Sequence, residues 1–359
     1  MGRFARVFRW LFFLLVVLPK GLSAAPIDWL YDVDVPVADQ SADVRAAAFK
    51  QALRTVLMRV SGLADVPSSP AVTAALDAPQ RYYLQYRYRT ENNPVPQGAP
   101  TKTLKLSVRF AESPIQKLIT EAALPQWSSN RPTTLAWIAV ADGATRTVLG
   151  ASDSSPLLIS LRARARERGL PLVLPMMDLD EQTDVPQSAL WSGNAAVIDR
   201  ASQRYPADQI LVGRVTHGAN DAWSADWQLT DHANQQRFAI ESATPEAAGA
   251  AIVDRIVEQL VVRYVVSSGS QERMRVRVDG IASVADYGAL LKYLGGLDFV
   301  SGVRVEEVQS NAVSLSLATR TPWDRLRDLL ALDGRLEPAE QLEVGADRRV
   351  LTWRGDTHR

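Results

Sequence analysis

Three groups of residues have types and spacing suited to binding. Trp223 and Trp227 stand two positions either side of Ala225 in "WSADWQL", as they would on one face of a strand that binds carbohydrate or peptide. Arg162 and Arg166 lie four residues apart in "LRARARERG", where a helix would turn both toward an anionic polymer or lipid headgroup. The acidic run "MDLDEQTD" offers the carboxylates that Ca²⁺ prefers.

Each group also has a purely structural explanation, which the patterns favour. The tryptophans alternate with a wholly polar face, as in a half-buried strand, so we expect core packing. The arginines are typical of a solvated helix face. The acidic run lacks the Gly and Glu that an EF-hand has at its sixth and twelfth positions, which favours a solvated acidic loop. Trp223, Trp227, Arg162 and Arg166 are kept as interaction candidates.

Known catalytic signatures are absent from the sequence. It has no cysteine, no G-x-S-x-G, no P-loop and no dinucleotide-binding glycine motif. His217, His232 and His358 have no partner at a metal-ligand spacing. We therefore expect no catalytic residue, no cofactor and no metal. Two carboxylates from distant segments would still make a glycosidase without leaving a motif.

The first 24 residues have the layout of a secretory signal peptide. Arg3, Arg6 and Arg9 precede an apolar run, and small residues follow it, with cleavage expected after Ala24. The apolar run is shorter than the ~20 residues that span a bilayer. An uncleaved anchor is the alternative. The absence of cysteine excludes lipoprotein attachment and disulfides, so we expect a periplasmic protein without a membrane span in the mature chain.

Composition and charge describe an ordinary globular protein of several domains. The chain has 359 residues, of which 47% are hydrophobic and 22% charged. Lys plus Arg equals Asp plus Glu at 40 each, whereas nucleic-acid-binding proteins usually have a basic excess. Removing residues 1–24 takes away four basic residues and no acidic one, so the mature chain has a net charge of −4.

Two polar segments divide the mature chain into three small α+β modules. The segments are "LPQWSSNRPT" (124–133) and "SSGSQER" (267–273), both of which read as linkers. They bound an N-terminal module at 26–125, a middle module at 131–266 and a C-terminal module at 272–354. We expect helices packed on mixed or antiparallel sheets in each module.

The periodicity of apolar residues predicts the element order within each module. The N-terminal module reads β-α-α-β-β-α, with a helix between Ser41 and Gly62 and a core face on "YYLQYRYR" made by Tyr82, Leu84, Tyr86 and Tyr88. The middle module reads β-α-β-α-β-β-β-α, with "LPLVLPM" as a buried strand. The C-terminal module reads β-α-β-β-α-β, the ferredoxin-like pattern.

Several stretches resemble an uncharacterised proteobacterial family, domain of unknown function 2066. These are "DVDVPVADQSADVRAAAFKQALRTVLMRVSG", "YPADQILVGRV", "WSADWQL", "VVRYVV" and "LRDLLALDGRL". The resemblance implies no activity, ligand or site residue. The middle module is also similar in its element pattern to the anticodon-binding-like fold of periplasmic envelope proteins, which implies envelope assembly by analogy of fold.

The sequence thus predicts a non-enzymatic periplasmic adaptor or assembly factor. Its expected partner is another envelope protein or an envelope polymer, and not a nucleic acid. Two alternatives stay open: a hydrolase of cell-wall polymer that uses carboxylates, and a small-ligand binding protein with a cleft between the second and third modules. The oligomeric state is left open.

Overall fold

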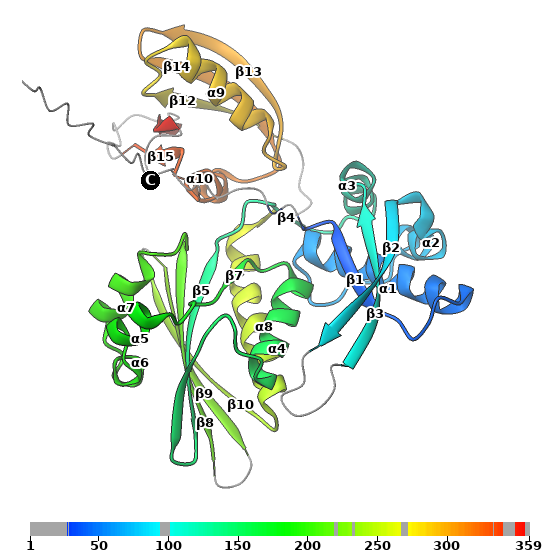
Figure 1. The fold of residues 1–359 in the computed structure, drawn as a ribbon. Helices are drawn as coiled ribbons and strands as arrows, with labels where there is room; N and C mark the ends of the chain where they lie inside the picture. Colours follow the sequence, from blue (N-terminus) through cyan, green and yellow to red (C-terminus); the bar gives the residue numbers. More distant parts are fainter. Residues whose placement is uncertain are drawn as a thin grey trace, which may run out of the picture.

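The computed structural model describes residues 27, 29–93, 101–218, 222–231, 234–266, 272–332, 334–339 and 349–355. In this part of the chain the helices and sheets fall into three separate modules, so the predicted α+β class is confirmed (Figure 1). The expected signal peptide, most of the second linker, His232 and His358 lie outside the described residues. No described helix is long and apolar enough to cross a membrane.

The N-terminal module packs its helices on one face of an antiparallel sheet with strand order β1-β3-β2. Leu57, Leu106 and Ile115, from a helix, a strand and the last helix, are buried in its core. Gly62 ends the first helix in a left-handed conformation with φ of 74°, as predicted. The elements are β1 (Asp32–Pro36), α1 (Ala42–Ser61), α2 (Pro70–Asp77), η1 (Pro79–Arg81), β2 (Tyr83–Asn93), β3 (Thr101–Phe110) and α3 (Glu112–Glu121).

The predicted core face of "YYLQYRYR" is correct for Tyr82 and Tyr88, which pack against the core, and wrong for Leu84 and Tyr86. Leu84 is 68% exposed and Tyr86 is 43% exposed. The pairing with β3 shifts between Tyr83 and Gln85, which breaks the simple alternation of faces, and β2 lies at the edge of its sheet. Tyr86 contacts Phe49 of α1 edge-on, with 5.1 Å between ring centroids.

The middle module is a mixed sheet with helices on both faces (Figure 1). Its strand order is β10-β9-β8-β5-β6, and β7 pairs with β5 in parallel. One face is covered by α4 and α8, the other by α5, α6 and α7. The elements are β5 (Thr134–Asp142), β6 (Thr145–Leu149), α4 (Pro156–Arg168), β7 (Leu172–Val173), α5 (Leu179–Asp184), α6 (Gln187–Ser192), α7 (Ala195–Ser202), β8 (Gln209–His217), β9 (Trp223–Asp231), β10 (Gln235–Ser242) and α8 (Pro245–Tyr264).

Several elements of this module differ from the prediction. The periodicity of apolar residues did not predict β6, α5 or α6, which are only five or six residues long. The acidic run is a helix, not a loop: the side chain of Asp178 accepts a hydrogen bond from the N–H of Glu181 as an N-cap, and Glu181 is buried. The predicted buried strand "LPLVLPM" shrinks to β7, whose two residues are only half-buried.

The C-terminal module has the strand order β13-β14-β12-β16-β15, in which the first four positions follow the ferredoxin-like order. One strand departs from that pattern. A crossover through α10 would deliver the last strand antiparallel to β12, but β16 runs parallel to it because the extra strand β15 intervenes and turns the chain back. The elements are β12 (Glu272–Asp279), α9 (Val284–Gly295), β13 (Val300–Gln309), β14 (Ala312–Thr319), α10 (Trp323–Ala331), β15 (Leu336–Pro338) and β16 (Arg349–Trp353).

The first predicted linker is a buried junction between the N-terminal and middle modules. Its strand β4 (Gln126–Trp127) pairs with β11 (Val265–Val266) directly after α8. Trp127 is 1% exposed and Arg131 is 3% exposed. The guanidinium of Arg131 lies 3.9 Å from the centroid of the Trp127 ring. This segment therefore connects the two modules as part of their shared interior.

Two buried arginines hold the junction by donating hydrogen bonds to backbone carbonyls. Arg131 donates to the carbonyls of Arg59 and Gly169, each at 2.7 Å, and Arg59 donates to those of Arg166 and Asp32, each at 2.7 Å. Three of these carbonyls lie at the C-terminal ends of α1 and α4, which carry partial negative charge. Burial lowers the pKa of Arg59 to about 10 and that of Arg131 to about 9, so both guanidinium groups stay charged at neutral pH.

Candidate functional site

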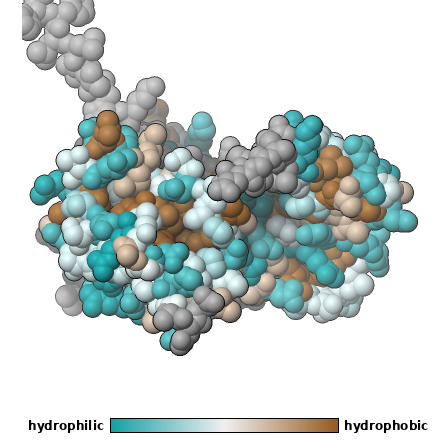
Figure 2. All heavy atoms as spheres, turned by 60° about the horizontal axis from the view of Figure 1, so that its bottom comes forward, coloured by the Kyte–Doolittle hydropathy of each residue, from teal (hydrophilic) through white to brown (hydrophobic). Residues whose placement is uncertain are grey.

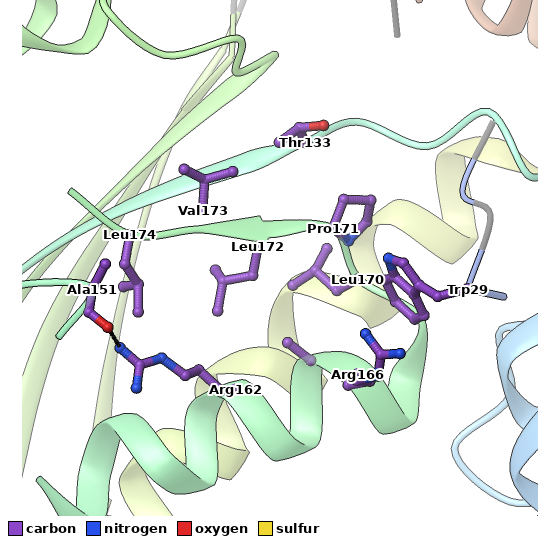
Figure 3. Close-up of a pocket in the computed structure, with 11 residues that line it drawn as sticks. Trp29, Thr133, Ala151, Arg162, Arg166, Leu170, Pro171, Leu172, Val173 and Leu174 are labelled. Atoms are coloured by element: carbon purple, nitrogen blue, oxygen red, sulfur yellow. Dashed lines mark hydrogen bonds between the residues drawn. The ribbon is translucent and has the colours of Figure 1, made fainter. Parts of the chain in front are cut away.

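A hollow of about 410 Å³ opens between β7 and α4, beside the N-terminal module (Figure 3). Its lining is apolar apart from one threonine and two arginines. Trp29 closes the end that faces the N-terminal module. The lining residues are Trp29, Thr133, Ala151, Arg162, Ala165, Arg166, Leu170, Pro171, Leu172, Val173 and Leu174. We call this hollow the β7 groove.

One wall of the β7 groove is the edge of a sheet. The N–H of Thr134 donates to the carbonyl of Pro171 at 2.9 Å, and Thr134 is the partner of Leu172 in the parallel register. Backbone groups alternate in direction along a strand, so the N–H and C=O of Leu172 face away from β5. The side chains of Leu172 and Leu174 turn toward α4, whereas Val173 packs on the opposite face of the sheet (Figure 3).

Arg162 and Arg166, the two arginines predicted as interaction candidates, both line the groove from α4. Arg166 lies over Trp29, with its guanidinium carbon 4.7 Å from the ring centroid. Arg162 donates to the carbonyls of Asp153 at 2.9 Å and Ala151 at 2.5 Å. These acceptors of Arg162 are neutral backbone groups. Within the described part of the chain, neither Arg162 nor Arg166 forms a salt bridge.

The other two arginines of α4 have a different role. Arg164 and Arg168 turn toward α8, where both form ion pairs with Asp254, at 2.9 Å and 3.2 Å. Arg168 is 1% exposed and belongs to the core. The i,i+4 spacing thus separates a structural pair from a pair that faces the groove. Among the described residues that line the groove, no carboxylate neutralises the second pair.

The two predicted tryptophans are not brought together with the arginines. Trp227 is 1% exposed and packs in the core against α8, with its ring filling the space beside Gly213. Trp223 is half-buried at the other end of the strand and stacks on His217, with 4.5 Å between ring centroids. The expected core role is correct for Trp227, and Trp223 lies outside the groove.

Metal chemistry has no support in the described residues. His217 contacts Asp142, with Nδ1 2.9 Å from Oδ1, and no third ligand completes a site. No group of three or more His, Cys, Asp or Glu side chains in the described part of the chain is placed to hold an ion. The acidic residues of α5 are used instead to cap the helix and to pair with Arg204.

A second hollow, of about 290 Å³, lies between α3 and the C-terminal module. It brings together Glu112 and Asp298, which come from different modules. Burial, and then the charge of Asp298, raise the pKa of Glu112. Asp298 accepts hydrogen bonds from the N–H and the hydroxyl of Ser129, at 2.8 and 3.1 Å, so it also ties the C-terminal module to the first junction.

Sequence reasoning found the arginines of the groove but missed its other walls. Trp29 lies in a turn before β1 and reaches Arg166 of the middle module, a contact for which the local sequence has no signal. The exposed edge of β7 was missed because "LPLVLPM" is apolar throughout and reads as buried. The prolines at 171 and 175 are the signal that a long strand cannot form there.

Comparisons with known proteins identify one resemblance. A family model described as a domain of unknown function (DUF8605) matches residues 24–128, which cover the N-terminal module and β4. No curated protein matches the chain. The resemblance to domain of unknown function 2066 and to the anticodon-binding-like fold stays a prediction. The N-terminal module is therefore similar to a family whose function is unknown.

Proposed function

We propose that this protein is an exported, non-enzymatic adaptor or assembly factor of the bacterial envelope, and that it holds its partner in the β7 groove. One observation carries the proposal: two arginines, which have no acidic partner among the described residues, face an apolar hollow beside a strand edge that points away from β5. Interaction sites often combine apolar surface with a few polar groups that set the orientation of the ligand.

The rigid junction supports an adaptor role. Trp29 and Arg166, which meet at one end of the groove, come from different modules. Their positions are fixed by the hydrogen bonds of Arg59 and Arg131 to both modules. A site built on fixed elements loses little conformational entropy when a partner binds.

The proposed location rests on the sequence. The basic, apolar and small-residue regions at residues 1–24 are those of a secretory signal peptide, and the absence of cysteine is compatible with an oxidising compartment without lipid attachment. The element pattern of the middle module, which is similar to the anticodon-binding-like fold, supports an envelope role by analogy.

The test is co-purification of tagged protein from crosslinked envelopes. The charge-reversed variant Arg162→Glu/Arg166→Glu is compared with wild type and with the control Arg237→Glu/Arg255→Glu, whose arginines are exposed outside the groove. We expect wild type and control to recover the same envelope partner, and the groove variant to lose at least nine-tenths of it. Equal recovery by all three proteins, or recovery of monomer alone, would contradict the proposal.

A hydrolase of cell-wall polymer is the second candidate, and Glu112 beside Asp298 is the observation that favours it. A carboxyl group with a raised pKa next to a second carboxylate is the arrangement that glycosidases use. The adaptor role is the stronger one because Asp298 already accepts two hydrogen bonds from Ser129. Release of soluble fragments from purified peptidoglycan, abolished by Glu112→Gln, would reverse this order.

A further inference from the structure

We propose that the β7 groove binds an extended acidic segment of a partner protein, which pairs with β7 as an added strand and places two alternate carboxylates against Arg166 and Arg162. This inference rests on the proposed function and specifies the chemistry of the partner. It follows from the backbone of β7, from the spacing of the two arginines, and from the closed ends of the groove.

The backbone of β7 offers one donor and one acceptor for an added strand. Leu172 directs both its N–H and its C=O away from β5, at the edge of the sheet that borders the groove. Unpaired groups of this kind on a sheet edge are a template for pairing with another chain. The flanking prolines at 171 and 175 have no N–H, so the pairing is centred on Leu172.

The spacing of the arginines matches that of a strand. Residues four apart on a helix have Cβ atoms about 5–6 Å apart. Alternate residues on a strand are about 6.6–6.8 Å apart and share one face. Leu172 and Leu174 already turn alternate side chains toward α4, and Arg166 and Arg162 lie in the same order along the helix (Figure 3). A neighbouring strand would therefore face the arginines with residues i and i+2.

The charge and the shape of the groove select an acidic partner over an apolar one. In the part of the chain that the structure describes, the lining holds two guanidinium groups and no carboxylate. Guanidinium groups bind carboxylates through paired hydrogen bonds, and the apolar walls made by Ala165, Leu172 and Leu174 keep water away from such contacts. A partner without negative charge would cover both arginines without compensating them.

Both ends of the groove limit the length of the bound segment. Trp29 stands at one end. At the other end the N–H of Ala151 donates to the carbonyl of Pro175 at 2.7 Å, so the loop before α4 crosses the strand edge there. The edge left between them runs from Leu170 to Leu174, at most about 13 Å at 3.3–3.4 Å per residue. The bound segment is a short acidic-x-acidic stretch, not a long strand.

The surface of the two neighbouring modules is compatible with docking of a larger partner around this segment. On the face shown in Figure 2, hydrophobic side chains gather in patches on both the middle and the N-terminal module, between hydrophilic ones. Small apolar patches of this kind can pack against a partner that is anchored elsewhere.

The probe for the test is a blocked, fluorescein-labelled pentapeptide, Val-Glu-Val-Glu-Val, measured by fluorescence anisotropy against the full-length protein. Its control is the Val-Gln-Val-Gln-Val peptide. We expect the Glu peptide to bind wild type at least ten times more tightly than the Gln peptide does. Its affinity should also fall at least tenfold for Arg162→Gln and for Arg166→Gln, and it should fall as the salt concentration is raised. The exposed variant Arg237→Gln should bind as wild type does.

Two further measurements separate strand addition from attraction of charge alone. Leu172→Pro removes the N–H that points away from β5 and also fixes φ, while Leu172→Ala shortens the side chain and keeps the N–H. We expect at least a tenfold loss of affinity with proline beyond that seen with alanine. Two N-methylated forms of the Glu peptide, one methylated at its valines and the other at its glutamates, should differ strongly in their affinity for wild type. The reason is that only one of these two sets of N–H groups faces β7. This pair of peptides does not depend on the folding of a variant.

Equal binding of the Glu and Gln peptides, or equal binding of both N-methylated peptides, would overturn the inference. Absence of binding by the Glu peptide would also overturn it. If the envelope partner is still recovered through the groove in the crosslinking experiment, the proposed function stands and only the acidic-strand partner fails. If the Glu peptide does not bind and the envelope partner is not recovered through the groove either, the proposed function fails as well.

Discussion

At the scale of single residues, the fit of Trp227 depends on the absence of a side chain at position 213. Gly213 and Trp227 are cross-strand partners, and a Cβ on Gly213 would lie 2.2 Å from the indole ring. We expect Gly213→Ala to destabilise the protein by about 1–3 kcal/mol, the usual cost of overpacking a core. The measurement is urea unfolding followed by tryptophan fluorescence.

Gly302→Ala is the matched control for this variant. Gly302 also lies in a strand, and a Cβ there would have its nearest neighbour at 3.6 Å, an ordinary contact. Its unfolding free energy should stay within about 0.5 kcal/mol of wild type. A Gly213→Ala protein as stable as Gly302→Ala would show that Trp227 does not occupy the position described.

Glu112 gives a prediction for pH. Its pKa is raised, first by burial and then by the charge of Asp298, so the folded state binds the proton more tightly than the unfolded state. Protonation therefore stabilises the fold below the ordinary value of 4.5, and this contribution is lost as the pH rises through the raised pKa. Glu112→Gln should be more stable than wild type at pH 7, by less than about 1 kcal/mol, because the side chain is only partly buried and solvent screens its charge.

Urea unfolding at two pH values tests this prediction. The difference between Glu112→Gln and wild type should shrink or vanish at pH 4, where the wild-type carboxyl is protonated in the folded state. A difference of the same size at pH 7 and pH 4 would assign the effect to packing and not to the charge of Asp298.

At the scale of elements, α4 and α8 approach closely at a glycine. A Cβ on Gly249 of α8 would lie 2.4 Å from the carbonyl oxygen of Leu157 in α4, which is backbone and cannot rotate away. Gly249→Ala should therefore destabilise the protein by about 1–3 kcal/mol, although alanine is the better helix former. The two helices carry Arg162, Arg166 and Asp254, so their spacing also sets the groove.

Gly288→Ala in α9 is the control for this contact. A Cβ on Gly288 would meet nothing within 4 Å, so only the helix propensity changes and the variant should gain about 0.5–1 kcal/mol. Thermal unfolding of both variants measures the two changes in stability. Stabilisation of similar size by Gly249→Ala would contradict the close crossing of α4 and α8.

Elements with strong local signals could be predicted from the sequence. The long helix α1 ends at Gly62 and α4 at Gly169, both in left-handed conformations, and α8 begins at Pro245. Elements set by the rest of the fold could not. The exposure of Tyr86 depends on a register shift in β2, and the direction of β16 depends on the extra strand β15. For the groove, the spacing of Arg162 and Arg166 indicated one wall, and Trp29 is brought to it only by packing between modules.

At the scale of the whole molecule, the junction makes the N-terminal and middle modules one unit. The segment around Arg131 reads as a linker because its residues are polar, yet Arg131 and Trp127 are buried. The guanidinium of Arg131 donates hydrogen bonds to backbone carbonyls at the ends of two other helices. The local sequence cannot reveal such distant partners. A division into independent modules at this point therefore misses the tightest contact between them.

Arg131→Met tests this unit. Methionine fills much of the space but leaves the carbonyls of Arg59 and Gly169 buried without a donor. We expect a loss of about 3 kcal/mol or more. We also expect the two modules to unfold in one calorimetric transition in wild type and in two in the variant. The exposed control Arg237→Met should stay within about 0.5 kcal/mol of wild type. One unchanged transition in Arg131→Met would mean that the arginine does not join the modules.

The most direct test of the central claim is site-specific photo-crosslinking in living cells. A photoreactive residue is placed at Thr133 or Ala151, which line the β7 groove, or at Ala144, which is exposed at the turn between β5 and β6 outside it. A partner held in the groove predicts one common adduct from the first two positions and none from Ala144. An adduct at Ala144 with none at Thr133 or Ala151 would contradict the assignment of the groove as the docking site.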